Sequence, residues 1–277
     1  MGIVIAITNQ KGGVGKTTTS INLAASLAAT QRKVLLIDLD PQGNATMGSG
    51  VEKSELETSI YDVLVDDLPF SEAIVEAESS GYDVLGSNVD LSSAEMELMD
   101  LDRREYRLSD ALKPIKDKYD FIIMDCPPSL SLLTINGLVA SDAVIIPMQC
   151  EYFALEGLSA LITTINRITE HLNEDLKIEG IIRTMYDPRN SLTQDVSKQL
   201  IEHFGDKVYR TVIPRNVRLA EAPSFGLPAL YYDKQSRGAK AYLALAGEIN
   251  RRYEAVIEAA NERRNETQST LENGTLK

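Results

Sequence analysis

The stretch over residues 10–18, QKGGVGKTT, decides the fold because it joins an apolar β-type run to a helical pattern. The run over residues 3–8 precedes it, and a helix is expected from Lys16 onward. The three glycines of the stretch have no Cβ, so the backbone can curl closely around an anion with its N–H groups inward. The positive end of the following helix adds to this attraction. The order of strand, glycine loop and helix predicts a phosphate-binding loop.

The side chains of this loop indicate which groups would meet a nucleotide. Lys16 is expected to pair with the β- and γ-phosphates of ATP, and the Thr17 hydroxyl to bind Mg²⁺. The usual pattern has glycine six residues before that lysine, whereas this chain has Gln10 there and a second cation, Lys11, after it. The predicted nucleotide-binding residues are Lys11, Gly12, Gly13, Val14, Gly15, Lys16, Thr17 and Thr18.

Two other apolar runs lead into aspartates. VLLID leads into Asp38 and Asp40, and FIIMD ends in Asp125. Open α/β sheets bind ligands beyond the carboxyl ends of their strands, so these carboxylates are expected to face the phosphate site. A carboxylate after the first of these runs can hold Mg²⁺ through water or orient an attacking water, and Asp125 is predicted to contact Mg²⁺ through water and the Thr17 hydroxyl. A turn or capping role for the acids remains open.

Short apolar runs alternate with longer helical patterns along nearly the whole chain. The expected strands cover residues 3–8, 34–38, 82–85, 121–125, 143–147, 178–184 and 208–213, and the expected helices 16–29, 104–118, 154–172, 191–204 and 237–262. Several strands are unbroken apolar runs, which is typical of strands buried on both faces of a parallel sheet. We expect one α/β domain over residues 1–262, a single doubly wound, mostly parallel sheet flanked by helices. A polar, disordered tail is expected over 263–277.

Composition and charge restrict the class of protein. The chain has 277 residues, 43% hydrophobic and 25% charged, which is ordinary for a soluble domain. Two cysteines cannot form a disulfide framework, which favours a reducing cytoplasm. The net charge of −13 argues against nucleic acid. Residues 181–240, however, hold ten Lys or Arg and six Asp or Glu, which gives +4 and keeps anion binding open.

Five segments together resemble one family. They are ITNQKGGVGKTT, LLIDLDPQGNAT, DCPPSL, PMQCEYFALEGL and VIPRNVRLAEAPSFG, and the resemblance covers about residues 1–255. The chain resembles the ParA/Soj chromosome- and plasmid-partitioning ATPases, which are P-loop NTPases with a deviant Walker A motif in the ParA/MinD superfamily. This resemblance implies an ATPase that uses ATP and Mg²⁺ and forms a homodimer sandwiched on ATP. It also implies non-specific DNA binding, a ParB partner that stimulates hydrolysis, and a cytoplasmic, nucleoid-associated location.

The resemblance also assigns roles to single residues. Lys11 would reach across the dimer to the partner's nucleotide, and Asp40 would position or activate the hydrolytic water. With Lys16, these make the implied catalytic set. Asp38 would lie near the bound Mg²⁺. Glu151 lies in the segment that approaches the partner subunit's nucleotide, by a looser inference.

Two further pairs of residues follow from the same resemblance. Pro214 and Asn216 match the loop that holds adenine. Arg189 and Arg218 match the basic positions that contact DNA, and both fall in the net-positive segment. A solvated surface charge or a structural ion pair is the alternative role for each arginine.

Two alternatives of different function share the phosphate loop. Membrane-associated relatives of the MinD type end in a basic amphipathic helix, whereas the tail here, EAANERRNETQSTLENGTLK, offers no apolar face. No membrane contact is therefore expected. A nucleotide-dependent positioner of a protein cargo uses the same motifs and remains open, and measured DNA binding separates the two.

Overall fold

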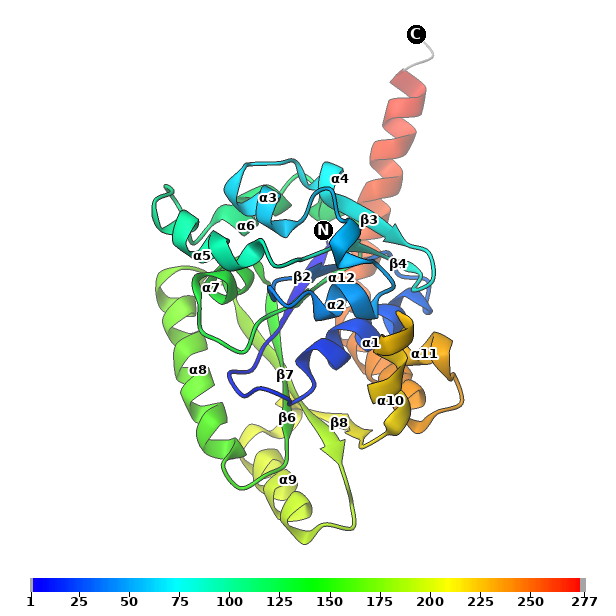
Figure 1. Ribbon diagram of the computed structural model, residues 1–277. Helices are drawn as coiled ribbons and strands as arrows, with labels where there is room; N and C mark the ends of the chain where they lie inside the picture. Colours follow the sequence, from blue (N-terminus) through cyan, green and yellow to red (C-terminus); the bar gives the residue numbers. More distant parts are fainter. Residues whose placement is uncertain (1, 275–277) are drawn as a thin grey trace.

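Eight strands form one sheet in the order β3-β4-β2-β5-β1-β6-β7-β8 (Figure 1), in a computed structural model that describes residues 2–274. The strands are β1 Ile3–Ile7, β2 Val34–Asp38, β3 Ile74–Ala77, β4 Tyr82–Leu85, β5 Phe121–Asp125, β6 Ala143–Gln149, β7 Lys177–Tyr186 and β8 Val208–Pro214. Every neighbouring pair is parallel except β3 and β4, which pair antiparallel at one edge. The expected doubly wound, mostly parallel sheet is confirmed.

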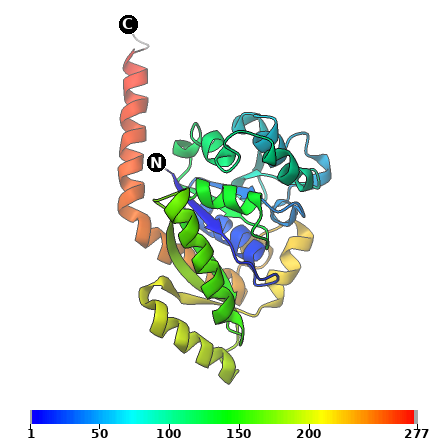
Figure 2. The ribbon, with the colours of Figure 1, turned by 90° about the vertical axis from the view of Figure 1, so that its left-hand side faces the viewer.

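Helices connect these strands and cover both faces of the sheet (Figures 1 and 2). The α-helices are α1 Lys16–Ala28, α2 Asn44–Gly48, α3 Ile60–Val65, α4 Phe70–Ala73, α5 Leu91–Met99, α6 Arg107–Leu112, α7 Leu132–Ala140, α8 Ala154–His171, α9 Ser191–Phe204, α10 Val217–Glu221, α11 Ala229–Tyr232 and α12 Arg237–Gly274. Short 3₁₀ turns cover Lys53–Glu55, Lys116–Lys118, Gly205–Lys207 and Ala222–Phe225. Among the described residues, no helix is long and apolar enough to cross a membrane.

The central strand β1 supplies side chains to two separate cores, because successive residues of a strand point to opposite faces. Val4 and Ala6 pack into the core that includes buried residues of α7 and α8. Ile3, Ile5 and Ile7 pack into the core that includes α1 and α12. All five residues are buried, as the unbroken apolar run predicts. The phosphate loop therefore begins at the most buried part of the sheet.

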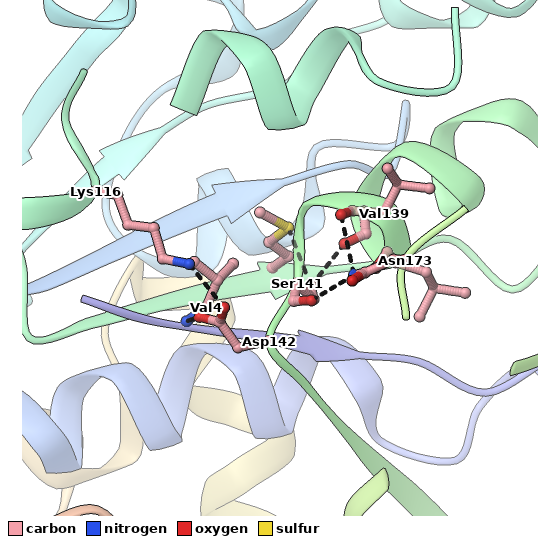
Figure 3. Close-up of polar contacts among 9 residues, drawn as sticks. Val4, Lys116, Val139, Ser141, Asp142 and Asn173 are labelled. Atoms are coloured by element: carbon pink, nitrogen blue, oxygen red, sulfur yellow. Dashed lines mark hydrogen bonds and ion pairs between the residues drawn. The ribbon is translucent and has the colours of Figure 1, made fainter. Parts of the chain in front are cut away.

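A partly buried polar contact fixes the amino end of β1 against β6 (Figure 3). The Asp142 carboxylate accepts a hydrogen bond from the Val4 backbone N–H at 2.8 Å. It also forms an ion pair with Lys116, whose Nζ lies at 2.7 Å. Charge-assisted hydrogen bonds of this kind are shorter and stronger than neutral ones. The contact lies at the end of the sheet opposite the phosphate loop.

Asn173 closes the carboxyl end of α7 (Figure 3). Its Nδ2 donates to the carbonyl oxygens of Leu138 and Val139 at 3.1 Å each, and to that of Ser141 at 2.8 Å. The last carbonyls of a helix have no partner inside the helix, so a side-chain donor satisfies them. The α8–β7 connection is thereby fixed to the α7–β6 connection.

Several elements differ from the sequence prediction. Helices α2 to α5, α7, α10 and α11 were not predicted, and the helix expected over 104–118 is only α6, followed by the 3₁₀ turn Lys116–Lys118. The edge strand β3 was not predicted; it has only four residues, and Val75 and Glu76 are exposed, so it has no buried run. A disordered tail is expected over 263–277, but α12 continues to Gly274 in the structure. Residues 275–277 lie outside the described residues. Helix formers such as Glu, Arg and Gln fill this stretch, and no glycine or proline interrupts it before Gly274.

Candidate nucleotide-binding site

The predicted phosphate loop connects β1 to α1 at the centre of the sheet, between β5 and β6. Gly13 and Gly15 adopt left-handed backbone angles, with φ of 71° and 88°, which only glycine adopts without strain. A Cβ placed on Gly12 or Gly13 would meet no atom within 4 Å. The inner side of the loop is therefore an open cradle, and it leads directly into the N-terminus of α1. Backbone N–H groups at such a terminus bind phosphate.

Three side-chain contacts hold the loop in place. Asn9 Nδ2 donates to the Pro147 carbonyl at 2.8 Å, while its Oδ1 accepts the Lys11 backbone N–H at 3.0 Å. The Thr184 hydroxyl donates to the Val14 carbonyl at 2.7 Å. These contacts tie the loop to β6 and β7, so side chains of the protein itself hold its shape. A preformed site loses less free energy to ordering when the ligand binds.

Lys16 is the buried cation of the loop, with only 7% of its surface exposed. Burial lowers the pKa of its ammonium group, and the negative charges of Asp125 and Asp40 oppose that shift. Its Nζ donates to the Lys11 carbonyl at 3.3 Å. A buried ammonium with a single long hydrogen bond is well placed to gain energy from an anion.

Asp125 lies next to the start of α1 and binds two of its hydroxyls. The Thr17 hydroxyl donates to Oδ2 and the Ser20 hydroxyl to Oδ1, both at 2.8 Å. The carboxyl group is fully buried, and desolvation, followed by the charge of Asp38, raises its pKa. The predicted relation between Asp125 and Thr17 is present as a direct hydrogen bond. Mg²⁺ would be held by the Thr17 hydroxyl, with Asp125 behind it.

Asp38 and Asp40 have different surroundings although they are two residues apart. Asp38 is fully buried, and its Oδ2 accepts both the backbone N–H and the hydroxyl of Thr46 at 2.8 Å. Its Oδ1 accepts the Asp40 backbone N–H at 3.1 Å. Asp38 therefore organises the β2–α2 connection, and burial raises its pKa. Asp40 is half-buried, and its Oδ1 accepts the Gln42 N–H at 3.0 Å, which leaves its other oxygen for a ligand or water.

Lys11 stands on the outer side of the loop and is exposed. Its Nζ lies 2.5 Å from Oε2 of Glu151, which follows β6. The two side chains are 48% and 51% exposed, so water competes with this ion pair. Tyr152 and Phe153 come directly after Glu151 and are also exposed, with their rings packed edge to face. The second lysine of the loop is thus exposed and ion-paired, whereas Lys16 is buried.

A cavity of about 350 Å³ opens beside the loop. Gly15 and Thr18 line it on one side, and Pro214, Asn216 and Tyr242 line it on another. Such a mostly apolar pocket with a few polar groups suits a planar base. The predicted adenine residues therefore share a cavity with the predicted phosphate residues.

The two predicted DNA arginines follow the carboxyl ends of β7 and β8. Arg189 is 88% exposed and forms a bidentate pair with Asp187, whose pKa falls to about 2 because of it. Arg218 is 49% exposed and pairs with Glu221 at 2.7 Å and Asp233 at 3.4 Å. Both arginines are accessible, and both already have acidic partners within the chain.

The structure thus gathers Lys16, Thr17, Asp40 and Asp125 around one loop. Sequence reasoning missed two positioning residues. Ser20 donates a hydrogen bond to Asp125, and Thr184 donates one to the backbone of the loop. For Ser20 the signal was available, because it lies one turn after Lys16 on the same helix. Thr184 had no such signal, since its role depends on β7 lying beside the loop.

Comparison with known proteins places this site in context. Residues 2–178 match a family model described as an AAA domain. The chain is 56% identical to the sporulation initiation inhibitor protein Soj of Bacillus subtilis, covering 90% of this chain and 98% of that protein. It is 54% identical to the chromosome partitioning protein ParA of Caulobacter vibrioides, with 89% and 93% covered.

Among solved structures, one similar protein is named as a cobyrinic acid a,c-diamide synthase from Mycobacterium smegmatis, crystallised with ADP and magnesium. It is 37% identical, covers 92% of this chain and 96% of its own, and superposes with a TM-score of 0.81.

Proposed function

Because the chain belongs to the ParA/Soj family of partitioning ATPases, we propose that it is an ATP-operated switch that dimerises on ATP and then binds DNA without sequence preference. The chain is an ATPase that takes ATP and Mg²⁺. The observation that carries the proposal is the open glycine cradle with two lysines on different sides, Lys16 buried and Lys11 exposed.

Each residue of the site has a part in binding and hydrolysing ATP. Lys16 and the loop N–H groups hold the phosphates, and the Thr17 hydroxyl holds Mg²⁺, which neutralises charge on the phosphate oxygens. Asp125 fixes the Thr17 hydroxyl through their hydrogen bond at 2.8 Å. Asp40 orients the attacking water with its free oxygen. Pro214 and Asn216 hold the base in the adjoining cavity.

Dimerisation follows from the position of Lys11. Its ammonium is outside the loop of its own chain, where it pairs with Glu151. In the ATP-bound dimer it exchanges that pair for the partner subunit's nucleotide. Intrinsic hydrolysis is slow because the site is complete only in the dimer.

DNA binding uses Arg189 and Arg218 on each subunit. A dimer that presents four arginines neutralises about four phosphates, so the slope of log affinity against log salt is about −3.6. The monomer, with half of these contacts, binds far more weakly. A ParB-like partner accelerates hydrolysis and releases the dimer, which gives a cytoplasmic, nucleoid-associated protein.

The test measures binding to random-sequence duplex DNA with ADP, with ATP, and with ATP at raised salt. The Asp40→Ala variant holds the ATP state, and Lys16→Ala, which cannot hold ATP, is the matched control. We expect binding with ATP alone, weakening with salt at the slope above, and none in Lys16→Ala. DNA binding by Lys16→Ala would contradict the switch.

A positioner of protein cargo is the second candidate. The pairs that Arg189 and Arg218 form with acids of their own chain favour it, because paired arginines can be structural. If the dimer forms on ATP but binds no DNA in any state, this second function replaces the first.

A further inference from the structure

We propose that Tyr152 and Phe153 form an apolar contact through which two copies of this chain meet in the ATP-bound dimer. This inference rests on the proposed function, since it takes ATP-dependent dimerisation as given and names a surface that supports it. The two residues, here called the aromatic corner, lie in the connection between β6 and α8. This connection leaves the same edge of the sheet as the phosphate loop (Figure 1), because β1 and β6 are parallel neighbours.

The aromatic corner is highly exposed for side chains of its size. Tyr152 is 74% exposed and Phe153 is 72% exposed, and within residues 2–274 no large hydrophobic side chain is more exposed than Tyr152. The two rings pack edge to face, with their centres 5.0 Å apart. Apolar area left in water costs free energy, so adjacent exposed rings favour a surface that another molecule covers.

The ion pair between Lys11 and Glu151 places the aromatic corner beside the proposed dimer contact. Glu151 directly precedes Tyr152, and its Oε2 is 2.5 Å from Lys11 Nζ. Consecutive Cα atoms are about 3.8 Å apart, so the rings lie close to the ammonium group. In the proposed dimer this ammonium enters the partner subunit's nucleotide site. The surface around it, which includes the aromatic corner, therefore faces the other copy.

Two-fold symmetry would bring the same surface of both copies together. A dimer in which each copy extends Lys11 to the other is symmetric, and its interface joins the same patch on each. An aromatic ring buries about 150–250 Å² when it is covered, so at this exposure the two rings offer roughly 200–350 Å² on each copy. A typical stable interface buries about 800 Å² per partner. The aromatic corner can therefore supply about a third of the contact.

The charges beside the rings argue for a second copy as the occupant. Residues 149–160 contain two acids, Glu151 and Glu156, and no lysine or arginine. Anionic lipid and DNA phosphates both repel such a segment. Lys11 and Glu151, in contrast, carry opposite charges next to the rings, so the patch is self-complementary when two copies meet about a two-fold axis.

The double variant Tyr152→Ala with Phe153→Ala tests the aromatic corner, in an Asp40→Ala background that holds the ATP state. Analytical ultracentrifugation with ATP should show a dimer dissociation constant at least about tenfold higher than without the double substitution, as for other truncated aromatic side chains in interfaces. Met96→Ala with Met99→Ala is the matched control and should change nothing, since it removes side chains on α5 that are 71% and 61% exposed.

Binding of Mg-ATP in dilute protein shows whether the variant monomer is intact. It should stay at the affinity of the unsubstituted chain, because neither ring lines the cavity beside the phosphate loop. Both rings are exposed, so their removal should also leave the melting temperature of the monomer unchanged.

A second measurement needs no substitution at the aromatic corner. Hydroxyl-radical oxidation, read by mass spectrometry, reports how accessible Tyr152 and Phe153 are with ADP and with ATP. With ATP, oxidation of the two rings should fall several-fold, whereas oxidation of Met96 and Met99 should stay the same. The protection should increase with protein concentration, because it requires a second copy.

Three results would overturn the inference while ATP-dependent dimerisation stands. The double variant may dimerise as tightly as the unsubstituted chain, the rings may stay as reactive in the dimer as with ADP, or their protection may be independent of protein concentration. The last result would assign the rings to a change within one copy. A wild-type chain that forms no dimer with ATP overturns the proposed function itself, and this inference with it.

Discussion

Lys11 and Glu151 form an ion pair within one chain, with the lysine Nζ 2.5 Å from the carboxylate Oε2. The two residues are 140 positions apart and come from the phosphate loop and the end of β6. In the proposed dimer this lysine has another partner. The pair therefore competes with dimerisation, and the competition can be measured.

Replacement of Glu151 by glutamine should strengthen ATP-dependent dimerisation. An ion pair this exposed contributes about 0.2–1 kcal/mol. The symmetric dimer breaks two of them, so the dimer dissociation constant should fall by about two- to thirtyfold. Analytical ultracentrifugation with ATP measures the change. Glu156→Gln, on the exposed first turn of α8, is the control. A weaker dimer in Glu151→Gln would instead mean that Glu151 contributes to the interface.

Asp40→Ala should bind ATP normally and lose about 10²-fold or more in hydrolysis, by analogy with other positioned catalytic groups. The substitution removes the carboxylate oxygen that would orient the attacking water, since the other oxygen of Asp40 accepts the Gln42 N–H. Equilibrium ATP binding and steady-state phosphate release are measured side by side. Turnover at the wild-type rate would remove Asp40 from the mechanism.

Asp187→Asn should strengthen DNA binding in the ATP state by several-fold. It removes the acid that holds Arg189 in a bidentate pair, so a DNA phosphate no longer competes with a carboxylate.

The double variant Arg189→Ala with Arg218→Ala should lose DNA binding while it keeps the ATP-dependent dimer. Fluorescence anisotropy with labelled duplex DNA reports both results. Unchanged affinity in the arginine variant would show that the DNA surface lies elsewhere.

Asn173→Ala should destabilise the fold by about 1–3 kcal/mol, because it removes three partly buried hydrogen bonds to carbonyls at the end of α7. Urea unfolding measures the loss of free energy. Gln235→Ala, at an exposed position, is the control and should change stability by less than about 0.5 kcal/mol. ATP affinity should stay normal, since Asn173 lies at the opposite end of the sheet from the loop.

Periodicity and loop chemistry were sufficient to predict the central sheet. The strand bounds of β2, β4 and β5 agree with prediction residue for residue. Strands β2 and β5 are apolar runs that end in aspartate, and β4 lies between two glycines, Gly81 and Gly86. Short helices such as α10 were not predicted, since five residues carry too little periodic signal. Asn216, which caps α10 by accepting the Arg218 N–H at 3.0 Å, shows that local capping sets such elements.

The candidate site was predictable only in part. The glycine loop and the aspartates at strand ends could be predicted, because each directly follows the apolar run that predicts its strand. The contacts of Lys11 with Glu151 and of Thr184 with the loop depend on which strands are neighbours, and no local pattern gives that order. The ion pairs that occupy Arg189 and Arg218 were likewise only alternatives until the fold placed the acids beside them.

The cavity beside the phosphate loop is built from both ends of the chain. Gly15 and Thr18 lie on one side, and Asn216 and Tyr242 on another, with the Tyr242 and Thr19 hydroxyls 3.0 Å apart. During synthesis the ribosome must therefore deliver most of the polypeptide before this cavity can close. A chain that stops before residue 213 would keep the phosphate loop, Thr184 and Met185 but lack the rest of this cavity's lining. A chain truncated there is therefore expected to bind ATP more weakly than the full chain.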